Sequence, residues 1–298
     1  MKVPCLFLSN NNFTGSLPPG LFDNPNLYVL SLSQTKFYGE LPNDIGNAIS
    51  IMYLMLDGNN FSGKVPKSIN NMIDLIILDL SNNRFSGNIF QNFGILNPYF
   101  IDLSSNEFSG EIQIDFLSNT NVLALGKNKF SDSLSRNFTR MASLEYLDIH
   151  DNKITSKLPD FICQISTLKI LNLRNNSIQG SIPDCISNLT SLRILDLSSN
   201  HLVREIPLKF GKLNGMIETS GLFFNDLVFY YNFINLETKV HDLIVNWKKS
   251  KQGLSFNNLK LYSLLDLSSN QLFGEIPASL GSLKALKLLN VSDRKSVV

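Results

Sequence analysis

Residues 192–207, LRILDLSSNHLVREIP, decide the fold, because versions of this segment recur along the chain. The other clear copies are LYVLSLSQTKFYGELP from Leu27, IMYLMLDGNNFSGKVP from Ile51, LIILDLSNNRFSGNIF from Leu75 and LKILNLRNNSIQGSIP from Leu168. The asparagine of the segment recurs every 22 to 24 residues from Asn11 to Asn200, with Thr35 replacing one copy, and returns at Asn270 after a gap of 70 residues. A regular period that is broken once indicates an array of repeats with one insertion.

Each repeat contains an L-x-L core, which predicts a short strand with its leucines on one side and its other residues on the opposite side. A single strand of this kind cannot bury its apolar face, so the copies are expected to stack into a parallel sheet around a continuous interior. The repeated Asn is predicted to bond backbone groups at the turn after the strand and to form a ladder. The following Gly permits the chain to turn, and the Pro ends the extended stretch.

The complete pattern, with its L-x-G-x-I-P extension after the asparagine, resembles the plant-specific extracellular leucine-rich repeat. The resemblance covers about 250 of the 298 residues. It implies an α/β solenoid, a curved right-handed array of about eleven repeats with a parallel concave sheet. The departures from the pattern are local: Phe90 and Gln113 replace the Pro, Asp132 and Arg204 replace the Gly, and Arg294 replaces the last Asn.

The insertion divides the chain into repeats at 1–212, an island at 213–261 and further repeats at 262–298. It contains several aromatic residues and the basic run WKKSKQG, and it resembles the island of plant receptor-like proteins. One hypothesis gives the island a binding role, because inserted loops often carry function, with Tyr231, Trp247, Lys248, Lys249 and Lys251 as its candidate residues. The alternative is that its aromatic residues pack the island onto the concave face.

Composition and spacing argue against several other functions. With 26 Lys and Arg against 25 Asp and Glu, the chain lacks the basic excess expected of a nucleic-acid-binding or membrane-attached protein. Cys5, Cys163 and Cys185 match no zinc or Cys-x-x-Cys spacing, so no metal or cofactor is expected. The three histidines fall in separate parts of the array, and the sequence predicts no enzymatic activity.

In one strip, the outward positions of the strands depart from the consensus of the repeat. Charged and aromatic residues are mixed there, as in protein-binding surfaces. We hypothesise that this strip contacts a peptide or protein ligand through Tyr53, Asp57, Phe100, Lys127, Tyr146, His150, Asp151 and Arg174. Alternatively, any one of these residues is an ordinary solvent-exposed position whose residue type varies without a role in binding.

Two kinds of covalent modification are candidates. The sequence has glycosylation sequons at Asn12, Asn60, Asn137, Asn175, Asn188 and Asn290, a number that chance alone could produce. Cys163 and Cys185 fall on the convex side of neighbouring repeats, so they form either a disulfide or two buried thiols.

The resemblance implies the ligand-sensing ectodomain of a plant receptor-like protein in defence or developmental signalling, on the extracellular side of the plasma membrane. Its partners would be a peptide or protein ligand and receptor kinases. Both ends are expected to fall inside repeats, and no signal peptide or membrane helix is expected within these residues. Two alternatives stay open: a secreted inhibitor of cell-wall-degrading enzymes, and a non-functional or decoy receptor fragment.

Overall fold

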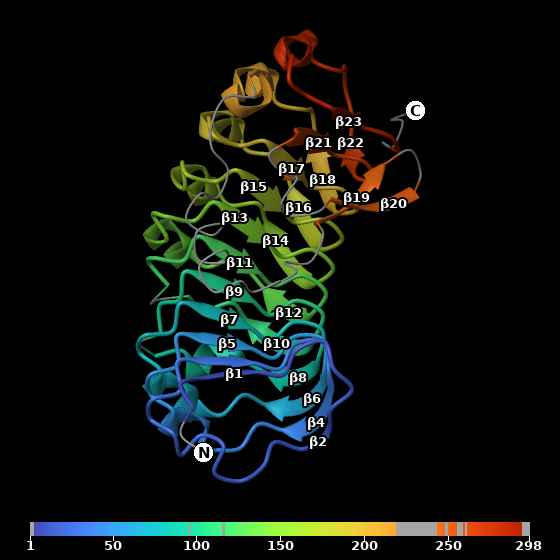
Figure 1. Ribbon diagram of the computed structural model, residues 1–298. Coiled ribbons are helices and arrows are strands. Elements are labelled where there is room, and N and C mark those ends of the chain that lie inside the picture. Colours follow the sequence, from blue (N-terminus) through green and yellow to red (C-terminus); the bar gives the residue numbers. More distant parts are fainter. Residues whose placement is uncertain are drawn as a thin grey trace.

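The computed structural model places the repeats as a curved stack that runs from the N-terminus to the C-terminus (Figure 1). This arrangement confirms the solenoid expected from the 24-residue period. The structure describes residues 3–94, 96–114, 117–218, 243–247, 250–254, 259 and 261–293.

The concave sheet has eleven parallel strands, and each strand comes from one repeat. The strand β17 pairs directly with β21, with Ile194 opposite Leu264, so the insertion leaves the array without interrupting the sheet. In order, the strands are β1 (Cys5–Phe7), β3 (Val29–Ser31), β5 (Tyr53–Met55), β7 (Ile77–Asp79), β9 (Phe100–Asp102), β11 (Val122–Ala124), β13 (Tyr146–Asp148), β15 (Ile170–Asn172), β17 (Ile194–Asp196), β21 (Leu264–Asp266) and β23 (Leu288–Asn290).

A second parallel sheet of ten strands lies beside the first and was not expected from the sequence. It forms mostly from residues that follow the repeated asparagine, where the pattern N-x-F-x-G places a buried side chain between two outward ones. The strands are β2 (Thr14–Gly15), β4 (Lys36–Glu40), β6 (Asn60–Lys64), β8 (Arg84–Gly87), β10 (Glu107–Glu111), β12 (Lys129–Asp132), β14 (Lys153–Lys157), β16 (Ser177–Gly180), β18 (His201–Arg204) and β22 (Gln271–Leu272).

Most of the described convex returns contain short 3-10 helices, which supply the helical part of the solenoid. Five of them begin directly after a Pro of the repeat, whose fixed φ suits the start of a helix. The helices are η1 (Ile45–Asn47), η2 (Lys67–Asn71), η3 (Ile89–Asn92), η4 (Arg136–Arg140), η5 (Asp160–Gln164), η6 (Asp184–Asn188), η7 (Leu208–Lys212), η8 (Asn214–Met216) and η10 (Ala278–Ser282). No helix in the described part of the chain is long and apolar enough to span a bilayer.

A disulfide joins two neighbouring convex helices. It links Cys163 in η5 to Cys185 in η6, with the two Cα atoms 5.7 Å apart. Of the two alternatives for these cysteines, the structure therefore has the covalent bond, whereas Cys5 is exposed and free.

The interior is filled by the central leucine or isoleucine of the concave strands β3 to β21 and by a row of phenylalanines. The rings of Phe37, Phe61, Phe85, Phe108 and Phe130 stack with centroids 6.1 to 6.3 Å apart. Every repeat buries its apolar residues against the next repeat, so the core is continuous along the array.

The repeated asparagine joins adjacent repeats through the backbone. The Nδ2 of Asn83 donates to the carbonyls of Leu80 and Ser81 in its own repeat, at 3.1 Å each, and of Leu56 in the preceding repeat at 2.9 Å. Its Oδ1 accepts from the backbone N of Phe61 at 3.0 Å. The same bonds form at Asn59, Asn106, Asn128, Asn152, Asn176, Asn200 and Asn270, which confirms the predicted ladder.

The glycine of the repeat adopts a positive φ that L-residues rarely take, as at Gly180 with φ +80°. Where the glycine is replaced, the backbone keeps this conformation: φ is +68° at Asp132 and +73° at Arg204. Ser156 occupies the same position with φ +101°. The stacking of the neighbouring repeats therefore imposes the conformation on residues that disfavour it. Arg294, which replaces the last Asn of the pattern, lies outside the described residues.

This strain predicts that Ser156→Gly raises the free energy of unfolding by about 1 kcal/mol, because glycine adopts a positive φ without a Cβ clash. Urea denaturation followed by circular dichroism measures the change. The control is Thr155→Gly, which lies in the same strand without a positive φ and should lower stability by a similar amount. A stability loss at Ser156 equal to that at Thr155 would contradict the explanation.

Candidate functional site

In nine of the eleven concave strands, β3 to β21, the first residue points away from the core and belongs to an apolar row on the concave face. The row is Val29, Tyr53, Ile77, Phe100, Val122, Tyr146, Ile170, Ile194 and Leu264, and it forms a cluster separate from the main core. Three of the predicted ligand-binding residues, Tyr53, Phe100 and Tyr146, belong to this row. They lie on the predicted face, but they are buried, at 7%, 1% and 2% exposure.

Part of the insertion packs on the same row. Leu254 and Leu259 are buried and belong to the cluster. Leu254 ends β20 (Ser250–Leu254), which pairs antiparallel with β19 (Leu243–Trp247). The positions of these two leucines agree with the alternative in which the island packs onto the concave face. That alternative, however, named the aromatic residues of the island and not its leucines.

The candidate island residues are only partly within the described chain. Tyr231, Lys248 and Lys249 lie outside the described residues. The backbone of Trp247 is in β19 and that of Lys251 is in β20, but their side chains lie outside the description. The binding role of the five residues therefore stays a prediction.

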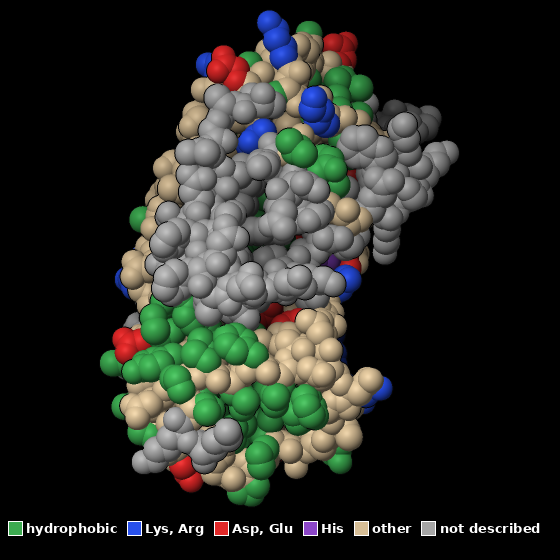
Figure 2. All heavy atoms as spheres, in the orientation of Figure 1, with side chains coloured by type: hydrophobic (Ala, Val, Ile, Leu, Met, Phe, Trp, Pro, Cys, Tyr) green, Lys and Arg blue, Asp and Glu red, His purple; other side chains and the backbone are tan. Residues whose placement is uncertain are grey.

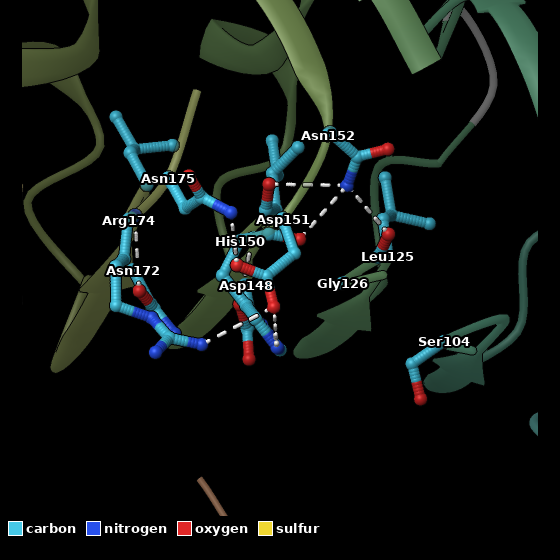
Figure 3. Close-up of polar contacts among 12 residues, drawn as sticks. Ser104, Leu125, Gly126, Asp148, His150, Asp151, Asn152, Asn172, Arg174 and Asn175 are labelled. Atoms are coloured by element: carbon cyan, nitrogen blue, oxygen red, sulfur yellow. Dashed lines mark hydrogen bonds and ion pairs between the residues drawn. The ribbon is translucent and has the colours of Figure 1, made fainter. Parts of the chain in front are cut away.

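The polar centre of the concave face is built around Asp148, the last residue of β13 (Figure 3). Its Oδ1 lies 2.7 Å from Nδ1 of His150 and accepts from the backbone N of His150 at 3.0 Å. Its Oδ2 accepts from the hydroxyl of Tyr146 at 3.3 Å. One carboxylate therefore orients two of the predicted ligand-binding side chains.

Burial and charge oppose each other in this group. Burial acts to raise the pKa of Asp148, but the charge and hydrogen bonds of His150, together with the charge of Arg174, outweigh it and lower that pKa. Burial acts to lower the pKa of His150, but Asp148 and Asp151 outweigh it and raise that pKa. The pKa of Tyr146 is raised well above its usual range by burial and by Asp148. The Asp148 carboxylate and the His150 imidazolium therefore stabilise each other.

The next repeat contributes a second group of polar contacts around Asp151. The Oδ2 of Asp151 lies 3.4 Å from an Nη of Arg174 and 3.8 Å from Nε2 of His150. Its Oδ1 accepts from Nδ2 of Asn175 at 2.8 Å. The backbone N of the exposed Lys127 donates to the carbonyl of His150.

The structure thus brings together five of the eight predicted residues: Lys127, Tyr146, His150, Asp151 and Arg174. Tyr53, Asp57 and Phe100 lie on the same face nearer the N-terminus. Of the eight, Lys127 is exposed, Asp151 is half-buried and the other six are buried.

Two carboxylate pairs on the concave face were not expected from the sequence, because the Asp of LDLSSN belongs to the consensus of the repeat. Asp79 lies opposite Asp102, and Asp196 lies opposite Asp266, in the register of the concave sheet. Burial and the charge of Asp266 raise the pKa of Asp196 to about 7. The repetition of Asp at one register position was the available signal, since parallel strands place equivalent residues side by side.

The sequons differ in their surroundings. Asn12, Asn60 and Asn188 are exposed, and Asn137 is half-buried. Asn175 donates to Asp151, and Asn290 donates to Asp266 Oδ2 at 3.0 Å and to Ser268 Oγ at 3.1 Å. A glycan on Asn175 or Asn290 would alter these bonds. Glycosylation stays a prediction at all six sites.

The sheet geometry and the repeated asparagine ladder define the class of protein, and sequence models of known families agree with it. The model described as Leucine rich repeat matches residues 155–202. A second model, Leucine Rich Repeat, matches residues 5–24, 50–72, 74–96, 143–165 and 263–283. No group of three or more His, Cys, Asp or Glu side chains within the described residues could hold a metal ion.

Three known proteins illustrate the similarity. Receptor-like protein 46 of Arabidopsis thaliana is 50% identical over 66 residues, which are 22% of this chain and 8% of that protein. The crystal structure of a TDR receptor superposes with a TM-score of 0.75 at 26% identity, over 98% of this chain and 48% of the receptor chain. The Arabidopsis receptor kinase HAESA was solved with the peptide hormone IDA and the co-receptor SERK1. It gives a TM-score of 0.57 at 27% identity, over 98% of this chain and 54% of the HAESA chain.

The chain is a leucine-rich-repeat solenoid, and it is similar to plant receptor-like proteins and to receptor ectodomains. It spans about half the length of these two solved chains and a small part of the receptor-like protein.

The Asp196–Asp266 pair predicts that Asp196→Asn stabilises the protein at pH 8 by roughly 2 to 4 kcal/mol and has little effect at pH 4. The folded state holds the Asp196 proton up to about pH 7, whereas an unfolded Asp loses it near pH 4, so wild-type stability falls as pH rises between these values. Asn172 already shows that an amide fits this row, since its Oδ1 accepts from the backbone N of Arg174.

Thermal unfolding of both proteins at pH 4 and pH 8 measures the difference. The control is Asn172→Asp, which adds a carboxyl opposite Asp196 and should lower stability at pH 8. An equal effect of Asp196→Asn at the two pH values would contradict the proton-linked explanation.

Proposed function

We propose that this chain is the ligand-binding segment of a plant cell-surface receptor-like protein, which recognises a peptide or protein in defence or developmental signalling. The observation that carries the proposal is the concave face. There a continuous apolar row lies beside the polar group formed by Lys127, Tyr146, His150, Asp151 and Arg174. Such a mixture of aromatic and charged side chains is typical of protein-binding surfaces.

The similar proteins support the same proposal. HAESA was solved with a peptide hormone and a co-receptor, and we propose a peptide or protein ligand and a receptor-kinase partner for the parent of this chain. That parent would lie at the plasma membrane with this segment outside the cell. Within it, residues 1–212 and 262–298 would be the repeats and 213–261 the island. The segment would bind its ligand and catalyse no reaction.

The proposal predicts that the purified chain selects binders from a random peptide library displayed on phage. Lys127→Ala and Asp151→Ala should each weaken the selected peptides, with a loss of about tenfold or more for the two changes combined. Both side chains are at least partly exposed, but Asp151 also pairs with the buried Arg174, so circular dichroism verifies that each variant is folded. Fluorescence anisotropy with labelled peptides measures the affinity.

The matched control is Lys129→Ala, which removes an exposed lysine from the second sheet, where it pairs with Glu107 at 2.7 Å. It should leave the affinity unchanged. If the library yields no binder, or if all three variants bind equally well, the proposed function is wrong.

A further inference from the structure

A column of four apolar side chains borders the concave row in the repeats nearest the N-terminus. Tyr28, Met52, Ile76 and Tyr99 each precede a concave strand. The backbone N of Met52 donates to the carbonyl of Tyr28 at 2.9 Å, and the backbone N of Ile76 donates to the carbonyl of Met52 at 2.8 Å. The side chains are therefore held side by side on consecutive repeats.

These side chains are accessible. Tyr28 is 42% exposed, and Met52, Ile76 and Tyr99 are half-buried against the apolar row. Figure 2 shows a broad hydrophobic area in the part of the molecule that Figure 1 assigns to these repeats. Contiguous apolar surface of this kind commonly marks an interaction site.

The apolar column ends after Tyr99. The same position is occupied by Asn121, Glu145 and Lys169 in the next three repeats, and Glu145 and Lys169 form an ion pair at 3.0 Å. Strands lie about 4.8 Å apart, so the apolar column is about 14 Å long. An extended peptide of about four or five residues covers that length.

The row next to this column already accepts aliphatic side chains. Farther along the array, Leu254 and Leu259 of the insertion belong to the same cluster as Ile77 and Phe100. The accessible column is thus continuous with a surface on which another segment of this chain packs.

The same four repeats are acidic on the other side of the row. Asp57, Asp79 and Asp102 lie there on consecutive repeats, and the segments 28–34, 52–58, 76–82 and 99–105 contain no Lys or Arg. Burial and the charges of Asp57 and Asp102 raise the pKa of Asp79 well above its usual range, so Asp79 favours its protonated form and the negative charge on this side is that of Asp57 and Asp102. Since buried charges are weakly screened, their field extends to the adjacent surface. Figure 2 shows acidic atoms at the border of the hydrophobic area.

We propose that this surface binds a basic, apolar peptide segment. Its apolar side chains would cover Tyr28, Met52 and Ile76, while a Lys or Arg side chain would extend toward the side of the row where Asp57 and Asp102 carry negative charge. The inference rests on the proposed function and names the chemistry of the ligand.

The same peptide library tests the inference through the sequences it yields. The selected peptides should combine aliphatic or aromatic residues with Lys or Arg. Ile76→Ser should weaken the labelled peptides about tenfold or more, and Asp57→Asn should weaken them severalfold and reduce the salt dependence of binding. Met52→Ser gives an independent second test of the apolar column.

Matched controls separate binding from folding. Ile73→Ser changes an isoleucine that is 64% exposed just after η2, and Asp160→Asn changes an exposed carboxyl in η5. Both should bind like the wild type, and circular dichroism verifies that every variant is folded. Selected peptides that are acidic, or that bind Ile76→Ser and Met52→Ser as tightly as the wild type, overturn this inference but leave ligand binding by the chain intact. A library without any binder overturns the proposed function itself.

Discussion

The asparagine that follows each concave strand is the interaction on which the rest of the structure depends. Its side chain bonds to carbonyls of its own turn and of the preceding repeat, and it accepts a backbone N–H from that repeat. Those backbone groups are buried, and an unpaired one would cost about 1–3 kcal/mol. The ladder therefore fixes the spacing and register of adjacent repeats. Thr35 shows the limits of substitution, since its hydroxyl donates to one carbonyl and contacts Asn59.

This register determines the chemistry of the concave face. Because equivalent residues of successive repeats lie side by side, a residue type that recurs in sequence becomes a continuous row in space. First positions of the strands produce an apolar row, and third positions produce stacked carboxyls such as Asp196 and Asp266. The same register forces Asp132, Ser156 and Arg204 into backbone conformations suited to glycine. Function and local strain thus arise from one geometric constraint.

The concave face combines two surfaces of different character. Toward the N-terminus it is apolar beside carboxyls, with Tyr28, Met52 and Ile76 accessible. Around β13 and β15 it is a hydrogen-bonded group of opposite charges in which Asp148 orients Tyr146 and His150. A ligand that spans both surfaces would gain apolar contact from the first and orientation from the second.

The sequence by itself determined the solenoid, the strand positions, the asparagine ladder and the side of the sheet on which Tyr146, His150 and Arg174 lie. These follow from a period of 24 residues and from the alternation of side chains in a strand, and both are local properties. Only the tertiary structure decided that six of the eight predicted residues are buried, that Asp148 links Tyr146 to His150, and that a second sheet forms. Burial and pairing depend on which repeats and which parts of the insertion pack against a residue, and no single repeat contains that information.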